Sequence, residues 1–292
     1  MKFSLIMATY GRDKVLLDFF ESLKNQDYKN FELIIVDQNH DDRVEKICDD
    51  CSWFEIKYLK ADKHNLSYAR NIGLKHVSGD VVAFPDDDCI YPPDLLSKVN
   101  LFFVKNPELD ILTGTQVDTE TRKKVSWFLP NSCLITKKNI LRTGNSFSLF
   151  IKIKDGLICF DEQFGIGGPF GSAEESDYRF RLLTLGLKGY YCPDIKIYHL
   201  DDRSGNVPAG KYYSYSLGLG AYFKKHLFFK QYWILLPTCF NLVLIRPIAG
   251  MLLSLIKLDL SLFVRYKAIF KGRVRGFVNY NKESYTVSKT FE

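Results

Sequence analysis

The sequence predicts an α/β protein with a mostly parallel sheet and helices on both faces of that sheet. Short apolar runs of strand length alternate with segments of helical periodicity over the N-terminal two thirds of the chain. This alternation is typical of βαβ units. The chain has 292 residues, of which 46% are hydrophobic, so it can bury a large core. That length fits one large domain, or one domain with an appendage.

The predicted elements follow one another in regular order. Strands are expected at residues 3–8, 31–36, 54–59, 81–84, 111–113 and 195–199. Helices are expected at residues 15–23, 44–51, 66–76, 95–104 and 173–186. Polar residues stand directly after three of the strands, at Thr9, Asp37 and Asp86. In such sheets ligands bind beyond the carboxyl ends of the strands, so this edge is the expected site.

The acidic run Asp86-Asp87-Asp88 is the feature that points most directly to chemistry. It follows the buried strand expected at 81–84 and Pro85. Adjacent carboxylates repel one another and raise their own pKa values, and a divalent cation relieves that repulsion. Hard oxygen ligands suit Mg²⁺ or Mn²⁺. The alternative is a solvated acidic turn before the helix that begins near Pro93. The clustering of polar turns at one sheet edge favours a site.

An irregular segment precedes the last predicted helix. The glycine-rich stretch 165–171 is either a lid over the site or a plain connection. The helix after it begins with Glu174, Glu175 and Asp177. Acidic residues in a first turn are ordinary partners of the helix dipole, although they can also belong to a functional site. The residues alone leave the structural and the functional interpretation open.

The C-terminal third differs in charge from the rest. Residues 203–292 carry 14 Lys and Arg but 3 Asp and Glu, whereas residues 1–202 carry 26 and 31. An apolar run at 233–256 is interrupted by Asn241, Arg246 and two prolines, so a simple membrane span is not expected. Interleaved aromatic and basic residues favour helices in the interface of an anionic membrane. The alternative is a buried helical hairpin or an oligomer contact.

Cysteine use and the N-terminus bear on location. Seven cysteines at irregular spacing suit a reducing cytosol. Met1-Lys2 leads directly into a strand-like run, so no signal peptide is expected. We therefore expect a cytoplasmic protein, peripheral to the inner face of the cell membrane. No nucleic-acid partner is expected, because no nucleic-acid-binding motif accompanies the basic charge.

Together these motifs resemble family 2 glycosyltransferases with the GT-A fold, the Rossmann-like fold of nucleotide-diphospho-sugar transferases. The resemblance covers about residues 3–200, and the order and spacing of its motifs carry it. The motifs are Ala8–Arg12, Ile35–Asp37, Ala69–Gly73, Phe84–Asp88, Glu174–Asp177 with Arg181, and His199. The resemblance implies a catalytic domain at 1–205. The composition of residues 206–292 predicts a basic, aromatic-rich helical region that contacts a membrane interface or another subunit.

The resemblance also implies a sugar-nucleotide donor, with the UDP or dTDP type favoured. Asp88 would bind Mn²⁺ or Mg²⁺, and His199 would be a further ligand or phosphate contact, although it could be a satisfied strand-end histidine. Asp86 would accept hydrogen bonds from the ribose, and Asp37 would accept a hydrogen bond from the imide N–H of the nucleobase. The residues implied in donor binding are Thr9, Tyr10, Arg12, Asp37, Arg70, Asp86 and Asp87. Arg70 could instead form a surface salt bridge.

For the acceptor, the resemblance implies a hydroxyl of a glycan or of a lipid-linked precursor of surface polysaccharide. A carboxylate would act as general base. Glu175 occupies that position and Glu174 is the fallback, since the family usually has Asp where this chain has Glu. Gln38 likewise stands where the family frequently has a second Asp, which weakens the inference about which nucleobase is bound. Direct displacement with inversion is implied. A nucleotidyltransferase or a non-catalytic subunit of this fold are the alternatives.

Overall fold

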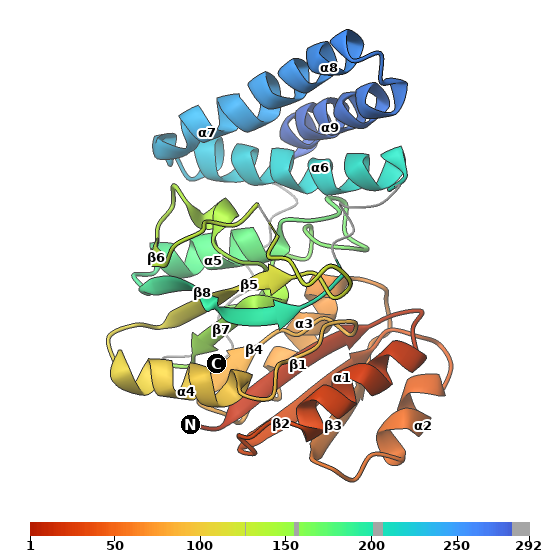
Figure 1. The fold of residues 1–292 in the computed structure, drawn as a ribbon, viewed down its shortest axis with the longest axis vertical. Coiled ribbons are helices and arrows are strands. Elements are labelled where there is room, and N and C mark those ends of the chain that lie inside the picture. The colour runs from red at the N-terminus through yellow and green to blue at the C-terminus, as the bar shows by residue number, and fades with distance from the viewer. Residues whose placement is uncertain (126, 155–157, 201–206, 282–292) are drawn as a thin grey trace. The chain divides into compact units, whose positions relative to one another are not determined.

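The computed structural model describes residues 1–125, 127–154, 158–200 and 207–281. These residues form two compact units (Figure 1). Described residues of the first unit lie within 1–159 and 179–200, and those of the second lie within 160–178 and 207–281. Residues 160–178 thus group with the C-terminal region. The domain boundary predicted between residues 205 and 206 lies outside the described residues.

The first unit is built on a mixed sheet of eight strands in the order β3-β2-β1-β4-β7-β5-β8-β6. Their bounds are β1 Phe3–Thr9, β2 Phe31–Asp37, β3 Glu55–Lys60, β4 Val81–Ala83, β5 Ile111–Val117, β6 Cys133–Ile135, β7 Leu149–Lys152 and β8 Gly189–Tyr198. Strands β3, β2, β1 and β4 are parallel, as are β5 and β8. Strands β7 and β6 pair antiparallel with their neighbours. The predicted α/β class is therefore confirmed.

The register of the parallel strands aligns their carboxyl ends. Thr9 of β1 pairs with Asp37 of β2, and Asp37 pairs in turn with Lys60 of β3. An isolated bridge joins Ala8 to Asp86 beyond β4. Strands β1 and β2 are buried on both faces, which explains their nearly continuous apolar runs. The polar residues that follow the runs consequently meet at one edge of the sheet.

Helices cover both faces of this sheet. Their bounds are α1 Lys14–Lys24, α2 Arg43–Asp49, α3 Leu66–Leu74 and α4 Leu95–Lys105. Alternate residues of β1, such as Leu5 and Met7, share a core cluster with Phe19 of α1, whereas Ile6 faces α3. A Cβ atom on Gly73 would lie 2.5 Å from Ile6 Cγ2, so glycine is needed for the close approach of α3 to β1.

Two strands of the irregular middle segment were not predicted. Strands β6 and β7 are three and four residues long, too short for a periodic pattern to identify them. The late strand predicted at 195–199 is the end of the longer β8. The other predicted strands and helices are present, with bounds that shift by a few residues.

The second unit contains the start of α5 Glu174–Thr184 and the C-terminal helices. These are α6 Ala209–Lys224, the π-helix η3 Lys225–Phe229, η4 Trp233–Leu235, α7 Leu236–Phe240, the π-helix η5 Asn241–Ile245, α8 Arg246–Ile256 and α9 Leu260–Asn279. Helices α6, α8 and α9 lie side by side (Figure 1). A Cβ on Gly220 would lie 2.0 Å from the Arg273 carbonyl oxygen, so small residues allow α6 and α9 to pack backbone to backbone.

The polar residues and prolines that interrupt the apolar run at 233–256 do not break its helix. Trp233–Ile256 is helical throughout its 24 residues and is long and apolar enough to cross a membrane, by length and composition only. Pro237 stands in the first turn of α7, near the start of this helix, where a missing N–H is tolerated, and Pro247 lies in its interior, directly after the π-turn η5 Asn241–Ile245. Asn241 opens the π-turn η5. About a third of the most apolar window is buried, at 33%.

Candidate active site

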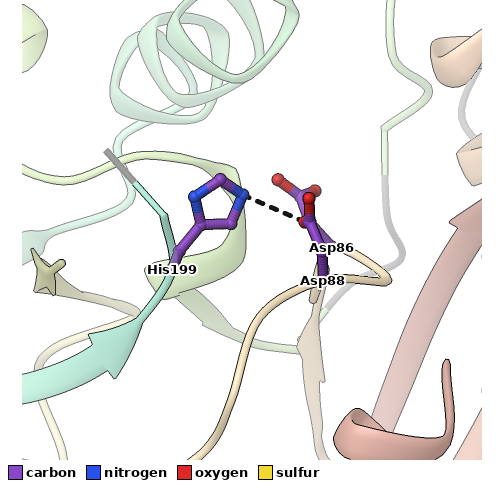
Figure 2. Close-up of side chains that lie close together, drawn as sticks. All are labelled: Asp86, Asp88 and His199. Carbon is purple, nitrogen blue, oxygen red and sulfur yellow. Dashed lines mark ion pairs between the residues drawn. The ribbon is translucent and has the colours of Figure 1, made fainter. Parts of the chain in front are cut away.

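Asp86, Asp88 and His199 converge beyond the ends of β4 and β8 (Figure 2). One ligand atom from each side chain lies within 4.8 Å of the other two. His199 Nε2 is 3.0 Å from Asp88 Oδ1, and all three residues are half-buried. Two carboxylates and an imidazole suit a divalent ion such as Mn²⁺ or Mg²⁺. The structure thus brings the two predicted metal ligands together and adds Asp86.

The orientation of His199 suits a metal ligand. Its backbone N–H donates to the carbonyl of Val117, at the end of β5. Its ring stacks on Phe147, with centroids 4.6 Å apart. Nδ1 lies 2.8 Å from the carbonyl oxygen of Leu200, and a donor Nδ1–H there leaves Nε2 directed at Asp88. A neutral imidazole held in this way presents a lone pair to a cation, so these residues fit such an ion.

The three adjacent carboxylates are balanced by three different cations. Arg70 lies 3.1 Å from Asp86, and it is buried, which excludes a surface salt bridge. Arg12 lies 2.5 Å from both Asp87 and Asp88. His199 faces Asp88. These pairings offset the mutual repulsion that the acidic run would otherwise carry.

Burial and charge divide the carboxylates into two kinds. Burial raises the pKa of Asp86 despite the charge of Arg70. It also raises the pKa of Asp87 to about 6, although Arg12 and a 2.7 Å hydrogen bond from Thr9 oppose it. For Asp88, burial is outweighed by the hydrogen bond and charge of His199, and the pKa falls to about 2. Asp88 is therefore the member of the run that stays ionised most readily.

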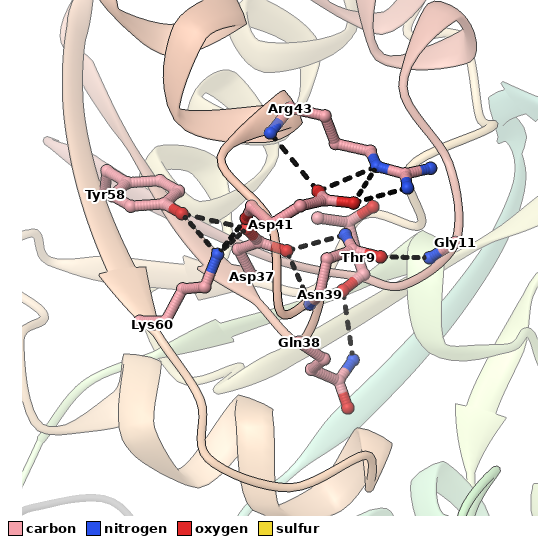
Figure 3. Close-up of polar contacts among 9 residues, drawn as sticks. All are labelled: Thr9, Gly11, Asp37, Gln38, Asn39, Asp41, Arg43, Tyr58 and Lys60. Carbon is pink, nitrogen blue, oxygen red and sulfur yellow. Dashed lines mark hydrogen bonds and ion pairs between the residues drawn. The ribbon is translucent and has the colours of Figure 1, made fainter.

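Asp37 is the centre of a second polar network (Figure 3). This buried carboxylate accepts hydrogen bonds from four protein groups. The donors are the backbone N–H of Asn39 at 2.8 Å, Asn39 Nδ2 at 2.7 Å, the Tyr58 hydroxyl at 2.8 Å and Lys60 Nζ at 2.9 Å. Burial, followed by the bond to Asp37, raises the pKa of Tyr58 to about 12. A nucleobase N–H would have to share Asp37 with these donors, and the predicted base contact stays a prediction.

Sequence reasoning missed Asn39, Tyr58 and Lys60 as partners of Asp37. The parallel register of β2 and β3 places Lys60 opposite Asp37. That pairing could have been found only after the strands had been assigned to neighbouring positions.

Tyr10 was predicted to line a base pocket. It is 47% exposed, and its ring stacks on that of His64 with centroids 3.8 Å apart. His64 carried no signal in the sequence.

Glu174 and Glu175 open α5 in the second unit. Glu174 is buried, whereas Glu175 is half-buried and accepts a 2.9 Å hydrogen bond from the Ser176 hydroxyl. Their predicted role as general base remains a prediction. The glycine-rich loop before them closes on itself, because Phe170 N–H donates to the carbonyl of Gln163 and Phe164 is fully buried.

Comparisons with known proteins point to one family. A family model described as glycosyl transferase family 2 matches residues 4–160. Glucosyl-dolichyl phosphate glucuronosyltransferase of Haloferax volcanii is 29% identical over 44% of this chain and 42% of its own length. Glycosyltransferase GlyA of Streptococcus pneumoniae is 34% identical over 69% of this chain and 29% of its own. Minor teichoic acid biosynthesis protein GgaB of Bacillus subtilis is 33% identical over 38% and 13%. The chain spans less than half the length of each of these relatives.

Solved structures agree at the level of the fold. TarS 1–349 of S. aureus in complex with UDP-GlcNAc has a TM-score of 0.56 at 16% identity, covering 92% of this chain and 90% of its own. The mannosyltransferase PcManGT of Pyrobaculum calidifontis, in complex with GDP-Man and Mn²⁺, has a TM-score of 0.66 at 15% identity, covering 94% and 86%. Such identities establish the fold alone, and the predicted GT-A fold is confirmed.

The Asp88–His199 pair should make the stability of the metal-free protein depend on pH. The pair raises the pKa of His199 from 6.5 to about 9, although burial opposes this shift. Its contribution is therefore complete below pH 6.5 and is lost as the pH rises through 9. We expect the melting temperature of wild type in EDTA to exceed that of His199→Gln most at pH 6, and this excess to shrink by pH 9.5. A difference that does not change with pH would contradict the pairing.

Proposed function

We propose, because this chain belongs to glycosyl transferase family 2, that it transfers a sugar from a nucleotide-diphosphate donor to an acceptor hydroxyl. The observation that carries the proposal is the convergence of Asp86, Asp88 and His199 at the carboxyl edge of the sheet. That edge is where α/β sheets bind ligands. The family resemblance favours a UDP or dTDP donor; of the two structural relatives, TarS is in complex with UDP-GlcNAc and PcManGT with GDP-Man.

Asp88, His199 and Asp86 would hold Mn²⁺ or Mg²⁺ at this edge. When bound, the ion neutralises the negative charge that develops on the diphosphate as the glycosidic bond breaks. Arg12 pairs with Asp87 and Asp88, and Arg70 pairs with Asp86, so their charges oppose the rise in carboxylate pKa that burial causes. The bound Mn²⁺ of the relative PcManGT supports a metal-dependent reaction.

For the acceptor half of the reaction, we assign the general base to Glu175, with Glu174 as the alternative. The acceptor oxygen bonds to the anomeric carbon as the bond to the diphosphate breaks, and the acceptor proton passes to the carboxylate. One direct displacement inverts the anomeric centre. Glu175 is more exposed than Glu174, which supports its access to a substrate. A base must reach the proton that it removes.

The C-terminal helices and the relatives support one class of acceptor. Named relatives act on a dolichyl phosphate or take part in teichoic acid biosynthesis, which supports a lipid-linked or surface-polymer acceptor. The segment from η4 to α9 carries exposed apolar side chains, and its sequence also contains basic residues. The exposed apolar residues include Trp233, Phe240, Leu252, Leu255, Ile256, Leu258 and Leu260. We therefore place the enzyme at the cytoplasmic face of an anionic membrane.

Removal of the Asp88 carboxylate should abolish metal-dependent turnover. With Mn²⁺ and UDP-, dTDP- or GDP-sugars, wild type should release nucleoside diphosphate in the presence of an acceptor. Asp88→Asn should lower this rate by at least 100-fold, because removing electrostatic stabilisation of a leaving group costs about that much. Asp94→Asn, at an exposed ion pair with Lys98 before α4, is the matched control.

The same assay distinguishes the alternatives. Wild-type rates in Asp88→Asn would contradict the assigned metal site. Release of pyrophosphate from nucleoside triphosphates would indicate a nucleotidyltransferase. Donor binding by calorimetry without turnover on any acceptor would indicate a non-catalytic subunit.

Glu175→Gln should separate the acceptor step from donor binding. The amide keeps the shape of the side chain but cannot take a proton, so kcat should fall by about 100- to 10,000-fold. The KM for the donor should stay within twofold of wild type. Glu174→Gln should have a smaller effect on kcat. The reverse order of the two effects would assign the base to Glu174, and wild-type kcat in both variants would exclude this pair.

Binding to the membrane surface should depend on lipid charge and on apolar side chains. Wild type should co-sediment with vesicles of phosphatidylglycerol and phosphatidylcholine, and high salt should weaken binding because it screens the charges. Replacing Leu255, Ile256 and Leu258 by Ser should reduce binding without changing the melting temperature, since all three are exposed. If wild type shows no vesicle binding but forms an oligomer, the helices are a protein contact instead.

A further inference from the structure

We propose that Asp161, Asp177, Lys225 and His226 form a buried ionic cluster that positions the carboxylates at the start of α5. This inference rests on the proposed function, because Glu174 and Glu175 are its candidate bases. The four residues are positioning residues rather than catalytic ones. All of them, together with both glutamates, belong to the second unit.

The cluster is compact and buried. Lys225 Nζ lies 2.8 Å from Asp161 Oδ2 and 2.6 Å from Asp177 Oδ1. His226 Nε2 lies 2.9 Å from the same oxygen of Asp177. None of the four residues is more than 9% exposed. Buried charges are costly unless they are paired and hydrogen-bonded, so the loss of one member removes a compensating contact from its neighbours in the cluster.

The position of Asp177 distinguishes this cluster from an ordinary helix cap. Acidic residues in a first turn normally face solvent and interact with the helix dipole. Asp177 instead has no exposed surface and points to Lys225. It lies two residues after Glu175 in the first turn of α5. Any shift of Asp177 therefore moves Glu175 with it.

Lys225 holds both ends of the segment that leads into α5. It contacts Asp161 before the glycine-rich loop and Asp177 after it. Its ammonium also lies 5.1 Å from the ring centroid of Phe164, within the loop. Lys225 and His226 open the π-helix η3, and such π-turns occur often at functional sites.

The backbone beside Glu174 is itself constrained. Ala173 has φ +70°, a left-handed conformation that residues with a Cβ rarely adopt. Such a conformation persists only where the surroundings impose it. Phe164 and Phe170 pack against Tyr280, which holds the loop from the other side. The ionic cluster and these aromatic contacts together constrain the first turn of α5.

This constraint matters for catalysis because a general base acts only within hydrogen-bond reach of the acceptor proton. A misplacement of about 1 Å can cost about 100-fold in rate. The groups assigned to the donor and the metal lie in the first unit and do not take part in the cluster. Loss of the cluster should therefore lower kcat and leave donor affinity unchanged.

The experiment compares Asp177→Asn, Lys225→Met and the neutral combination Asp161→Asn/Asp177→Asn/Lys225→Met with wild type. Lys224→Met is the matched control, because Lys224 is the neighbouring lysine and lies over Phe228 instead. We expect Asp177→Asn and the neutral combination to fold and to lose at least tenfold in kcat. The donor KM and the thermal shift with Mn²⁺ and nucleotide should stay within twofold of wild type. Lys224→Met should retain wild-type kcat.

Amide hydrogen exchange provides a readout that does not need activity. The amides of residues 175–178 should exchange at least tenfold faster in Asp177→Asn and in the neutral combination, but not in Lys224→Met. Wild-type kcat and wild-type exchange in these variants would overturn the proposal, even if the melting temperature falls. Faster exchange in a protein whose wild type transfers no sugar would support the cluster and refute the proposed function.

Discussion

The mutual repulsion of Asp86, Asp87 and Asp88 is the constraint on which the arrangement of the first unit depends. Each carboxylate has a cation from a different part of the chain: Arg70 from α3, Arg12 from the loop after β1, and His199 after β8. These elements must therefore meet at one edge of the sheet. The parallel register of β1, β2 and β4 supplies that meeting point.

Burial then sets different roles for carboxylates of the same type. Asp86 and Asp87 have raised pKa values because burial dominates, whereas His199 and Arg12 lower that of Asp88. The second unit also contains two close carboxylates, and their charge is compensated in a different way. There Lys225 pairs with Asp161 and Asp177 away from solvent, and His226 Nε2 lies 2.9 Å from Asp177. One charged cluster is half-open and suited to a ligand, and the other is closed and suited to holding backbone in place.

Periodicity in the sequence was enough to predict the sheet, its flanking helices and the edge at which the polar turns meet. The short strands β6 and β7 were not predicted, because a run of three or four residues has no reliable periodicity. The helix over Trp233–Ile256 continues through Asn241, which opens the π-turn η5, and through Pro247, which follows that turn. The hydrogen-bond partners of Asp37 were not predicted, because they depend on which strand lies beside β2.

By itself, the sequence predicted the fold class and the acidic run at the end of β4, and the resemblance to the family suggested Asp88 and His199 as candidate ligands. The fold class and the acidic run follow from local patterns, because strand and helix periods and the chemistry of adjacent carboxylates are properties of neighbouring residues. Only the tertiary structure decided that Asp37 is already hydrogen-bonded and that Lys225 joins Asp161 to Asp177. Such contacts join residues far apart in the chain, and their energy depends on burial that no local pattern specifies.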